Sequence, residues 1–328
     1  MGPAPKLQSD LWEGRVGVWG GGLYSDDFAL DLRSTISAVS RLPFDDEALV
    51  DLLAESEPTA ASNPADEYYT TFWLVVAHQF AKRGIRSDRV RENALAIIDS
   101  AADVALREKL GASSSDVRKR QKMLAEIRAL ITAGVPKPAP RSVLRKPQPL
   151  LMQVGDVFAY PTFDGRCRNP YFASKESDRL GTATPAWTCD SWAAMVIVDC
   201  GRAFGFLSWY RPLKILTAAV HKPTLDDVRR VPLWRLAQAG TCSAAHFKRM
   251  EFQKIGTVLI DEGKLRELYP DMRPGTSQAV QDISIANSLH VGRPGAADEV
   301  GVRGANRCKP SAVIALEAIL RPSVPSVE

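Results

Sequence analysis

The chain has 328 residues, of which 45% are hydrophobic and 24% are charged, and its formal net charge is +4. These values are ordinary for a globular protein of about two domains, and so small a charge does not by itself indicate nucleic-acid binding. No apolar run approaches the roughly 20 residues of a membrane-spanning helix, and the polar opening Met1–Asp10 does not resemble a signal peptide. We therefore expect a cytoplasmic protein without a membrane contact.

Cysteines and histidines are too few and too scattered to indicate a metal site. No pair of cysteines has CxxC spacing, and the four histidines form no HExxH or HxH pattern. The sequence therefore predicts no metal and no cofactor. The five cysteines all lie in the second half of the chain, at Cys167, Cys189, Cys200, Cys242 and Cys308.

Residues 1–133 show helical periodicity and predict a bundle of five helices with short connections. Capping residues and glycine stops mark the ends of these helices. They are expected to begin at Ser25–Asp27, after Pro43 with Asp45 as cap, after Asn63-Pro64, at Ser87 and at Ser113–Ser115, and the last three to end at Arg83 before Gly84, near Gly111 and at Gly134.

Residues 134–149 contain five prolines, a density that excludes helix and favours an extended linker. After this segment the pattern changes to short runs rich in β-branched and aromatic residues, with Asp164-Gly165 as a hairpin turn. The predicted strands are Val154–Tyr160, Trp192–Asp199, Phe204–Tyr210 and Thr257–Ile260, and the predicted helices are Thr241–Phe252, Gly263–Leu268 and Ala312–Leu320.

The expected fold class is therefore α+β. A helical domain at residues 1–133 precedes the linker at 134–149, and a β-rich α+β domain follows at 150–328, with a mostly antiparallel sheet or small barrel and a few short helices.

Charge is uneven in the helical half. Residues 1–81 hold 4 Lys/Arg and 13 Asp/Glu, a net charge of −9, and residues 82–146 hold 16 and 7, a net charge of +9. Solvated basic faces that pair with the acidic first part explain this pattern simply. The alternative is nucleic-acid binding through residues 82–146, centred on Arg118, Lys119, Arg120 and Lys122.

The segment Trp19–Asp31 begins with Trp19, Gly20 and Gly22 and continues with the acidic pair Asp26 and Asp27. A phosphate loop would need Lys-Ser/Thr after the last glycine, and carboxylates repel phosphate. A flexible turn that lets Trp19 fold back onto the helices is the simpler interpretation. Asp26, Asp27 and Asp31 would be able to hold a divalent cation, but helix capping is the more ordinary role. The segment resembles the opening of a bacterial family of unknown function. Since no activity is known for that family, the resemblance implies a fold only.

The segment from Val154 to Pro161, followed by Asp164-Gly165-Arg166, carries a second resemblance. It is similar to the first hairpin of an immunity-protein family from bacterial polymorphic toxin systems. That resemblance implies a small β-barrel-like domain that acts by binding a protein.

Aromatic residues gather in the β-rich half. Such residues belong to a core or, where they are exposed, anchor an interface with a partner protein. The predicted partner-binding residues are Trp187, Trp192, Trp209, Tyr210 and Arg211.

Cys242 and His246 are four residues apart and would share one face of a helix. An imidazole beside a thiolate can create a nucleophile, which makes an enzyme of unrecognised class the alternative function. The sequence shows no residue to orient the histidine. The favoured hypothesis is a non-catalytic protein-binding module of the immunity-like kind, with an unknown protein partner.

Overall fold

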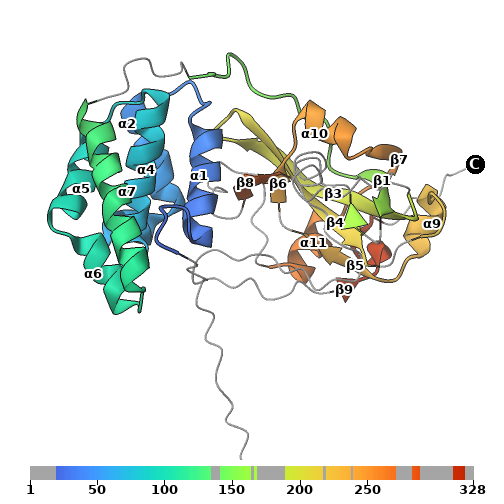
Figure 1. The fold of residues 1–328 in the computed structure, drawn as a ribbon. Coiled ribbons are helices and arrows are strands. Elements are labelled where there is room, and N and C mark those ends of the chain that lie inside the picture. Colours follow the sequence, from blue (N-terminus) through green and yellow to red (C-terminus); the bar gives the residue numbers. More distant parts are fainter. Residues whose placement is uncertain are drawn as a thin grey trace, which may run out of the picture. The chain divides into compact units, whose positions relative to one another are not determined.

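The protein has the predicted α+β fold. The structure, a computed structural model, describes residues 20–133, 141–163, 166–167, 189–216, 219–237, 239–270, 283–288 and 313–321. The chain divides into two compact units (Figure 1). The helical unit comprises Met1–Ile36 and Asp45–Arg141, and the sheet unit comprises Ser37–Phe44 and Ser142–Glu328.

Helices make up most of the described part of the helical unit. The bounds are Asp27–Val39 for α1, Asp46–Ser56 for α2, Pro58–Ser62 for α3, Tyr69–Arg83 for α4, Asp88–Asp99 for α5, Ala102–Lys109 for α6 and Ser114–Ala133 for α7. The unit boundary falls inside α1, whose last residues belong with the sheet unit.

The predicted helix ends are confirmed where a cap determines them. The Asp45 side chain accepts a hydrogen bond from the Ala48 N–H at 2.8 Å, and the Ser87 hydroxyl accepts one from the Val90 N–H at 3.2 Å. Gly84 ends α4 in the left-handed conformation, with φ of 67°. These positions were predictable because capping depends on a few neighbouring residues.

Two predicted helices differ from the structure. The helix predicted after Asn63-Pro64 begins only at Tyr69, because the Asp66 carboxylate holds the Tyr68 N–H in a turn at 2.8 Å. The helix predicted from Ser87 to Gly111 breaks at Ala101, whose φ of 55° separates α5 from α6.

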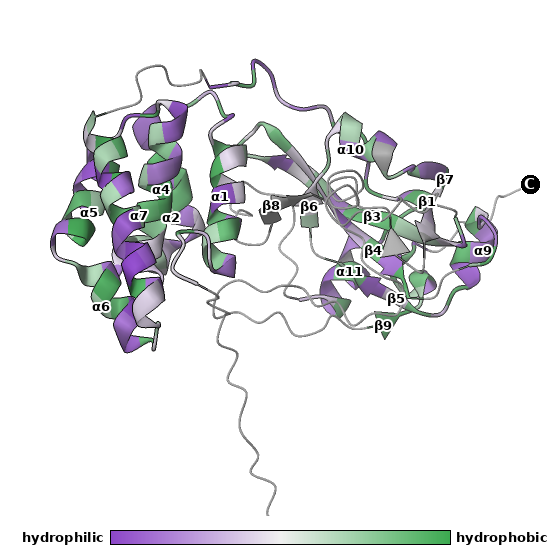
Figure 2. Ribbon diagram, viewed as in Figure 1, coloured by the Kyte–Doolittle hydropathy of each residue, from purple (hydrophilic) through white to green (hydrophobic). Residues whose placement is uncertain are grey.

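Helix α4 is the centre of the helical unit. Ten of its residues are buried, from Thr70 to Ala77 together with Gln79 and Phe80. A helix that is buried on every side lies inside a bundle, and α4 packs against α3, α5 and α7. The longer α7 has both hydrophilic and hydrophobic residues along its length (Figure 2).

The described sheet has nine strands and is mostly antiparallel. The strands are Asp156–Phe163 (β1), Arg166–Cys167 (β2), Ser191–Ala203 (β3), Leu207–Ile215 (β4), Trp234–Leu236 (β5), Ala239–Thr241 (β6), Gln253–Thr257 (β7), Ile283–Ser288 (β8) and Val313–Ile314 (β9). The main order is β2-β1-β3-β4-β5-β9, while β7 pairs with β1, β6 pairs with β4, and β8 runs parallel to β6. Short helices α9 (Leu225–Arg230), α10 (Ala244–Arg249), α11 (Glu262–Leu268) and the 3₁₀ helix η1 (Leu316–Ile319) complete the unit.

Strand β4 exchanges one neighbour for another along its length. Trp209 and Tyr210 pair with β6, whereas Leu213 to Ile215 pair with β5. Pro212 lies at the exchange, next to a bulge on β3. Because proline has no N–H to donate, it is tolerated where a ladder is interrupted.

Other predictions for the second half need correction. The predicted helix Thr241–Phe252 is reduced to α10, and the strand predicted at Thr257–Ile260 lies earlier, as β7. The predicted helix Ala312–Leu320 is β9 followed by one turn of 3₁₀ helix. The turn Asp164-Gly165 lies outside the described residues.

The predicted linker also differs in its second part. Residues 141–149 form no helix or strand, but Gln148 is fixed to the hairpin of β3 and β4. Its carbonyl accepts from Arg202 Nε at 2.8 Å, and its side chain accepts from the Ser208 N–H at 3.1 Å. The division between the units therefore falls after Arg141, and the following segment belongs to the sheet unit.

Replacing Ala101 by glycine should stabilise the protein. Ala101 is exposed and left-handed, a conformation that costs an L-residue about 1–2 kcal/mol. Glycine removes that strain, but it also raises the conformational entropy of the unfolded chain, which costs about 0.4–1 kcal/mol of stability. We therefore expect the free energy of unfolding, measured in urea, to increase by about 0.5 kcal/mol.

The matched control is Ala105→Gly, an exposed position inside α6, which should destabilise by about 0.5–1 kcal/mol. Equal effects of the two substitutions would contradict the left-handed break.

Candidate functional site

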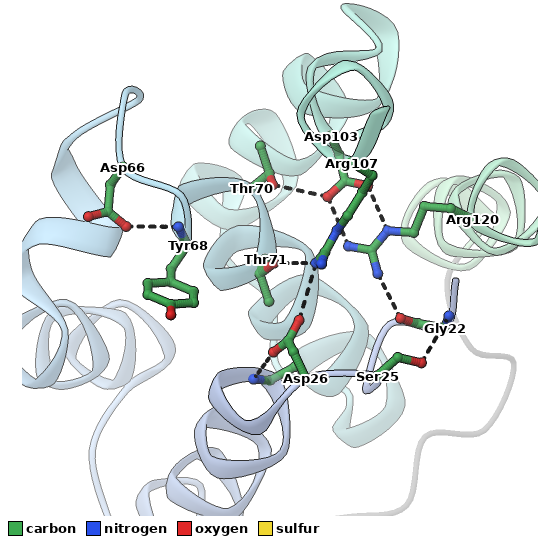
Figure 3. A network of polar contacts seen from close by, with 11 residues as sticks. Gly22, Ser25, Asp26, Asp66, Tyr68, Thr70, Thr71, Asp103, Arg107 and Arg120 are labelled. Carbon is green, nitrogen blue, oxygen red and sulfur yellow. Dashed lines mark hydrogen bonds and ion pairs between the residues drawn. The ribbon is translucent and has the colours of Figure 1, made fainter. Parts of the chain in front are cut away.

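The loop before α1 is held by a buried ion pair. Asp26 caps α1 by accepting from the Ala29 N–H at 2.6 Å, and its other oxygen lies 3.2 Å from Arg107 Nη2. Arg107 also donates to Thr71 Oγ1 on α4 at 3.0 Å (Figure 3). Asp26 thus joins α1 to α6 through one carboxylate.

A second buried ion pair holds the glycines of the same loop. Arg120 on α7 donates from Nε and Nη2 to the two oxygens of Asp103, at 2.6 and 2.8 Å. Its Nη1 donates to the Gly22 carbonyl at 2.8 Å, and Thr70 donates to Asp103 at 3.0 Å (Figure 3). Arg120 is 1% exposed and Asp103 is 0% exposed, so this two-pronged pairing is fully desolvated.

These bonds decide the charge of Asp103. Burial alone would raise the pKa of its carboxyl. The hydrogen bonds and charge of Arg120, the charge of Arg107 and the Thr70 hydrogen bond outweigh burial, so the pKa is lowered. Asp103 is therefore an anion at neutral pH, and its negative charge balances the positive charge of Arg120.

The three glycines at positions 20–22 form part of the loop before α1. A Cβ on Gly21 would lie 2.2 Å from the Asp116 carbonyl oxygen at the start of α7, so only glycine fits. Gly20 has a φ of 157° and Gly22 is exposed, while Trp19 lies outside the described residues.

Of the candidate cation ligands, Asp26 has both oxygens engaged and Asp27 is exposed in the first turn of α1. The described part of the chain contains no group of three or more metal-ligating side chains.

The anchored loop forms one wall of a pocket within the helical unit. Its volume is about 370 Å³. Two residues come from the loop, one from α4 and four from α7: Leu23, Tyr24, His78, Met123, Glu126, Ile127 and Leu130. Four of the lining residues are apolar, and the lining residues Tyr24 and His78 are hydrogen-bonded to each other.

A chain of hydrogen bonds runs along the edge of this pocket. Arg83 donates to the Gln79 side-chain oxygen, and the Gln79 amide donates to the Tyr24 hydroxyl. The Tyr24 hydroxyl lies 2.6 Å from His78 Nδ1. These contacts fix the tyrosine ring, because its oxygen is held from two sides.

The same edge is positively charged. Arg33 lies over the Tyr24 ring with its guanidinium carbon 5.3 Å from the ring centre. Burial, followed by the charges of Lys82, Arg33 and Arg83, lowers the pKa of His78 to about 4. Burial also raises the pKa of the Tyr24 phenol. Both rings are therefore neutral at pH 7.

Sequence reasoning did not assemble this site. Tyr24 belongs to the segment Trp19–Asp31, and His78 belongs to the third predicted helix. Because 54 residues separate them, no local pattern indicates their contact. The available signal was the polar pair His78-Gln79 directly after the apolar run Phe72–Ala77, with Lys82 one turn after His78.

The aromatic anchor predicted in the β-rich half is wrong for three of its residues. Trp209 is 1% exposed, Tyr210 is 0% exposed and Arg211 is 7% exposed. Trp209 lies against Gly201 on the paired strand, where an added Cβ would approach the indole to 3.0 Å, and the Tyr210 hydroxyl accepts from the Leu151 N–H at 2.7 Å. Trp192 is half-buried, and Trp187 lies outside the described residues.

The Cys242 and His246 pair does not form the predicted helical face. Cys242 precedes α10, whose cap is Ser243, and only His246 lies in the helix. The thiol is 1% exposed and belongs to the hydrophobic core, and burial raises its pKa to about 12. A protonated, buried thiol is not a nucleophile, so the structure contradicts this alternative site.

The predicted basic strip loses its central residue. Arg120 is committed to Asp103, whereas Arg118, Lys119 and Lys122 are exposed on α7. Lys119 also lies 3.7 Å from Asp116.

Comparisons of this chain with protein-family models, curated proteins and solved structures find no match. The two family resemblances of the sequence therefore stay predictions. Among the described residues, no helix combines the length and the apolar character that crossing a bilayer demands.

Replacing Arg120 by methionine should destabilise the protein strongly. The change leaves the buried Asp103 anion without its main partner, which costs about 3–5 kcal/mol in comparable pairs. Urea unfolding at neutral pH measures the loss.

The control is Arg118→Met, an exposed neighbour on α7, for which we expect less than about 0.5 kcal/mol. A loss below about 1 kcal/mol for Arg120→Met would show that the pair does not anchor the unit.

His78 should remain neutral well below the ordinary histidine range. Its pKa in the folded chain, about 4, lies below the unfolded value of 6.5. The unfolded state therefore takes up the proton first as the pH falls, and stability present above pH 6.5 is lost towards pH 4. In the variant His78→Phe, the free energy of unfolding should depend less on pH in this window.

An NMR titration of the imidazole in the intact chain gives the direct measurement. If His78 in the folded chain titrated near pH 6.5, the imidazole would not be buried against Tyr24 in the way described above.

Proposed function

We propose that this chain is a non-catalytic protein-binding module and that the pocket of the helical unit receives an apolar side chain of its partner. The observation that carries the proposal is the pocket itself, lined by Leu23, Met123, Ile127 and Leu130 and bordered by the fixed Tyr24–His78 pair. The immunity-like resemblance at Val154–Pro161 supplies the class of partner, a toxin protein.

The size and rim of the pocket favour an anchoring side chain. At about 370 Å³ it lies at the small end of ligand sites, which span about 300–1,000 Å³. Tyr24, His78, Met123 and Leu130 are all half-buried, and Glu126 is exposed, so the pocket opens at the surface. Interfaces are enriched in tyrosine and methionine, and their strongest contacts place one apolar side chain in such a hollow.

The wall of the pocket is rigid on one side and adaptable on the other. The loop carrying Leu23 and Tyr24 is fixed by Arg120 and by the Gln79 hydrogen bond. Met123 is an unbranched side chain that adjusts to different shapes. Preorganisation of one wall lowers the entropy lost on binding, while Met123 lets the pocket close on its occupant.

The alternatives draw less support. The enzyme hypothesis relied on Cys242, which is a core thiol. Of the four central residues of the nucleic-acid hypothesis, Arg118, Lys119 and Lys122 remain exposed on α7. Lys119 pairs with Asp116, however, and the acidic Glu126 lies on the same helix.

A photo-reactive phenylalanine analogue at Met123 should cross-link a protein in cells that make the chain natively. The side chain at this position lines the pocket and would touch the inserted residue. The identified partner is then purified, and Met123→Glu should weaken its binding to the full chain by about tenfold or more, because a carboxylate replaces an apolar wall. Calorimetry measures the difference.

The control places the same analogue at Gln121, an exposed position on another face of α7. Cross-linking at both positions alike, or unchanged affinity of Met123→Glu, would count against the pocket as the binding surface.

A further inference from the structure

The direction of the hydrogen-bond chain beside the pocket can be assigned from its first member. Arginine only donates, so the Gln79 oxygen accepts from Arg83 and the Gln79 amide must donate to Tyr24. The Tyr24 oxygen is then the acceptor of that bond, and its own O–H is free to donate. The other contact of this hydroxyl is His78 Nδ1. If Nδ1 donated, the Tyr24 O–H would have no acceptor among the described residues, so we assign Nδ1 as the acceptor.

This direction fixes the tautomer of His78. A neutral imidazole has one protonated nitrogen, and if Nδ1 accepts, the proton is on Nε2. Within the described residues, the imidazole of His78 makes no hydrogen bond other than that to Tyr24. His78 lines the pocket, and an Nε2–H to which no described residue is bonded would be the donor that this side chain offers to an occupant.

The charges around the pocket favour the same kind of ligand. Lys82, Arg33 and Arg83 all act on His78, and the carboxylate in the pocket lining is Glu126. Lys82 is exposed and lies one helical turn after His78, where it faces the same side of α4. A donor backed by three cations and opposed by one exposed carboxylate attracts an anionic acceptor.

We propose that the pocket recognises a carboxylate carried beside an apolar side chain, as an acidic segment of the partner protein presents it. The apolar group packs against Leu23, Met123 and Ile127, and the carboxylate accepts from His78 Nε2–H near Lys82. An ammonium group is excluded by the same features, because it would meet a donor and three like charges.

This inference rests on the proposed function for the source of the carboxylate, and small probes test its chemistry independently of any partner. The probes are 3-phenylpropanoate, its amide and 3-phenylpropylammonium, which share one apolar group and differ in charge. Each is titrated at neutral pH into the full chain labelled at its methionine methyl groups. Binding is read from the Met123 methyl signal and from the His78 Nε2–H signal.

We expect the carboxylate to shift both signals and to bind about tenfold or more tightly than the amide, while the ammonium probe does not bind at about 10 mM. Lys82→Gln should weaken binding of the carboxylate probe by about threefold to tenfold. The fold should not change, because Lys82 is exposed. Arg118 is an exposed cation outside this pocket, so Arg118→Gln should leave the affinity for the carboxylate probe unchanged.

Three results would overturn the inference: equal binding of the amide and the carboxylate, tighter binding of the ammonium probe, or no response of Met123 to any probe. Cross-linking of a protein at position 123 together with any of these would leave the proposed function standing. Carboxylate selectivity without a cross-linked protein would retain the site and reject the protein partner.

Discussion

Two buried arginine–aspartate pairs hold the helical unit together around its first loop. Arg107 joins Asp26, and Arg120 joins Asp103 while also bonding the Gly22 carbonyl. Desolvating such charges is expensive, and the cost is offset only when both partners are present and further hydrogen bonds satisfy them. Thr70 and Thr71 supply two such bonds from the central helix α4, although Arg107 Nε has no hydrogen-bond partner among the described residues. The pairs therefore act mainly as a geometric constraint that admits one position of the loop relative to α4, α6 and α7.

The pocket follows from that constraint. The Gly22 carbonyl is tied to α7 immediately before Leu23 and Tyr24, so these two side chains are delivered to the same helix that carries Met123 and Ile127. Tyr24 then meets Gln79 and His78 on α4, and the polar edge of the pocket is completed. A stability element and a binding element thus share one loop. A change that loosens Arg120 would therefore disturb the pocket, although Arg120 is not part of its lining.

The sheet unit is organised by its hydrophobic core and by the exchange of neighbours along β4. Of the side chains predicted as an aromatic binding surface, Tyr210 packs inside this core and Trp209 packs against Gly201 of the paired strand. Cys242 is part of the same core, which explains both its high pKa and its lack of nucleophilic character. The candidate binding site among the described residues therefore lies in the helical unit, at the pocket bordered by Tyr24 and His78.

Local sequence determined the features that depend on a few neighbouring residues. The caps at Asp45 and Ser87, the stop at Gly84 and the change from helices to strands near the prolines all follow from propensity and hydrogen bonding over one turn. The tertiary structure alone decided which charges pair and which aromatic residues are buried. Asp26 and Arg107 are 81 residues apart, and Tyr24 and His78 are 54 apart, so no local pattern records their contact. The break at Ala101 has the same origin, because an alanine adopts a left-handed conformation only where the surrounding packing compensates its strain.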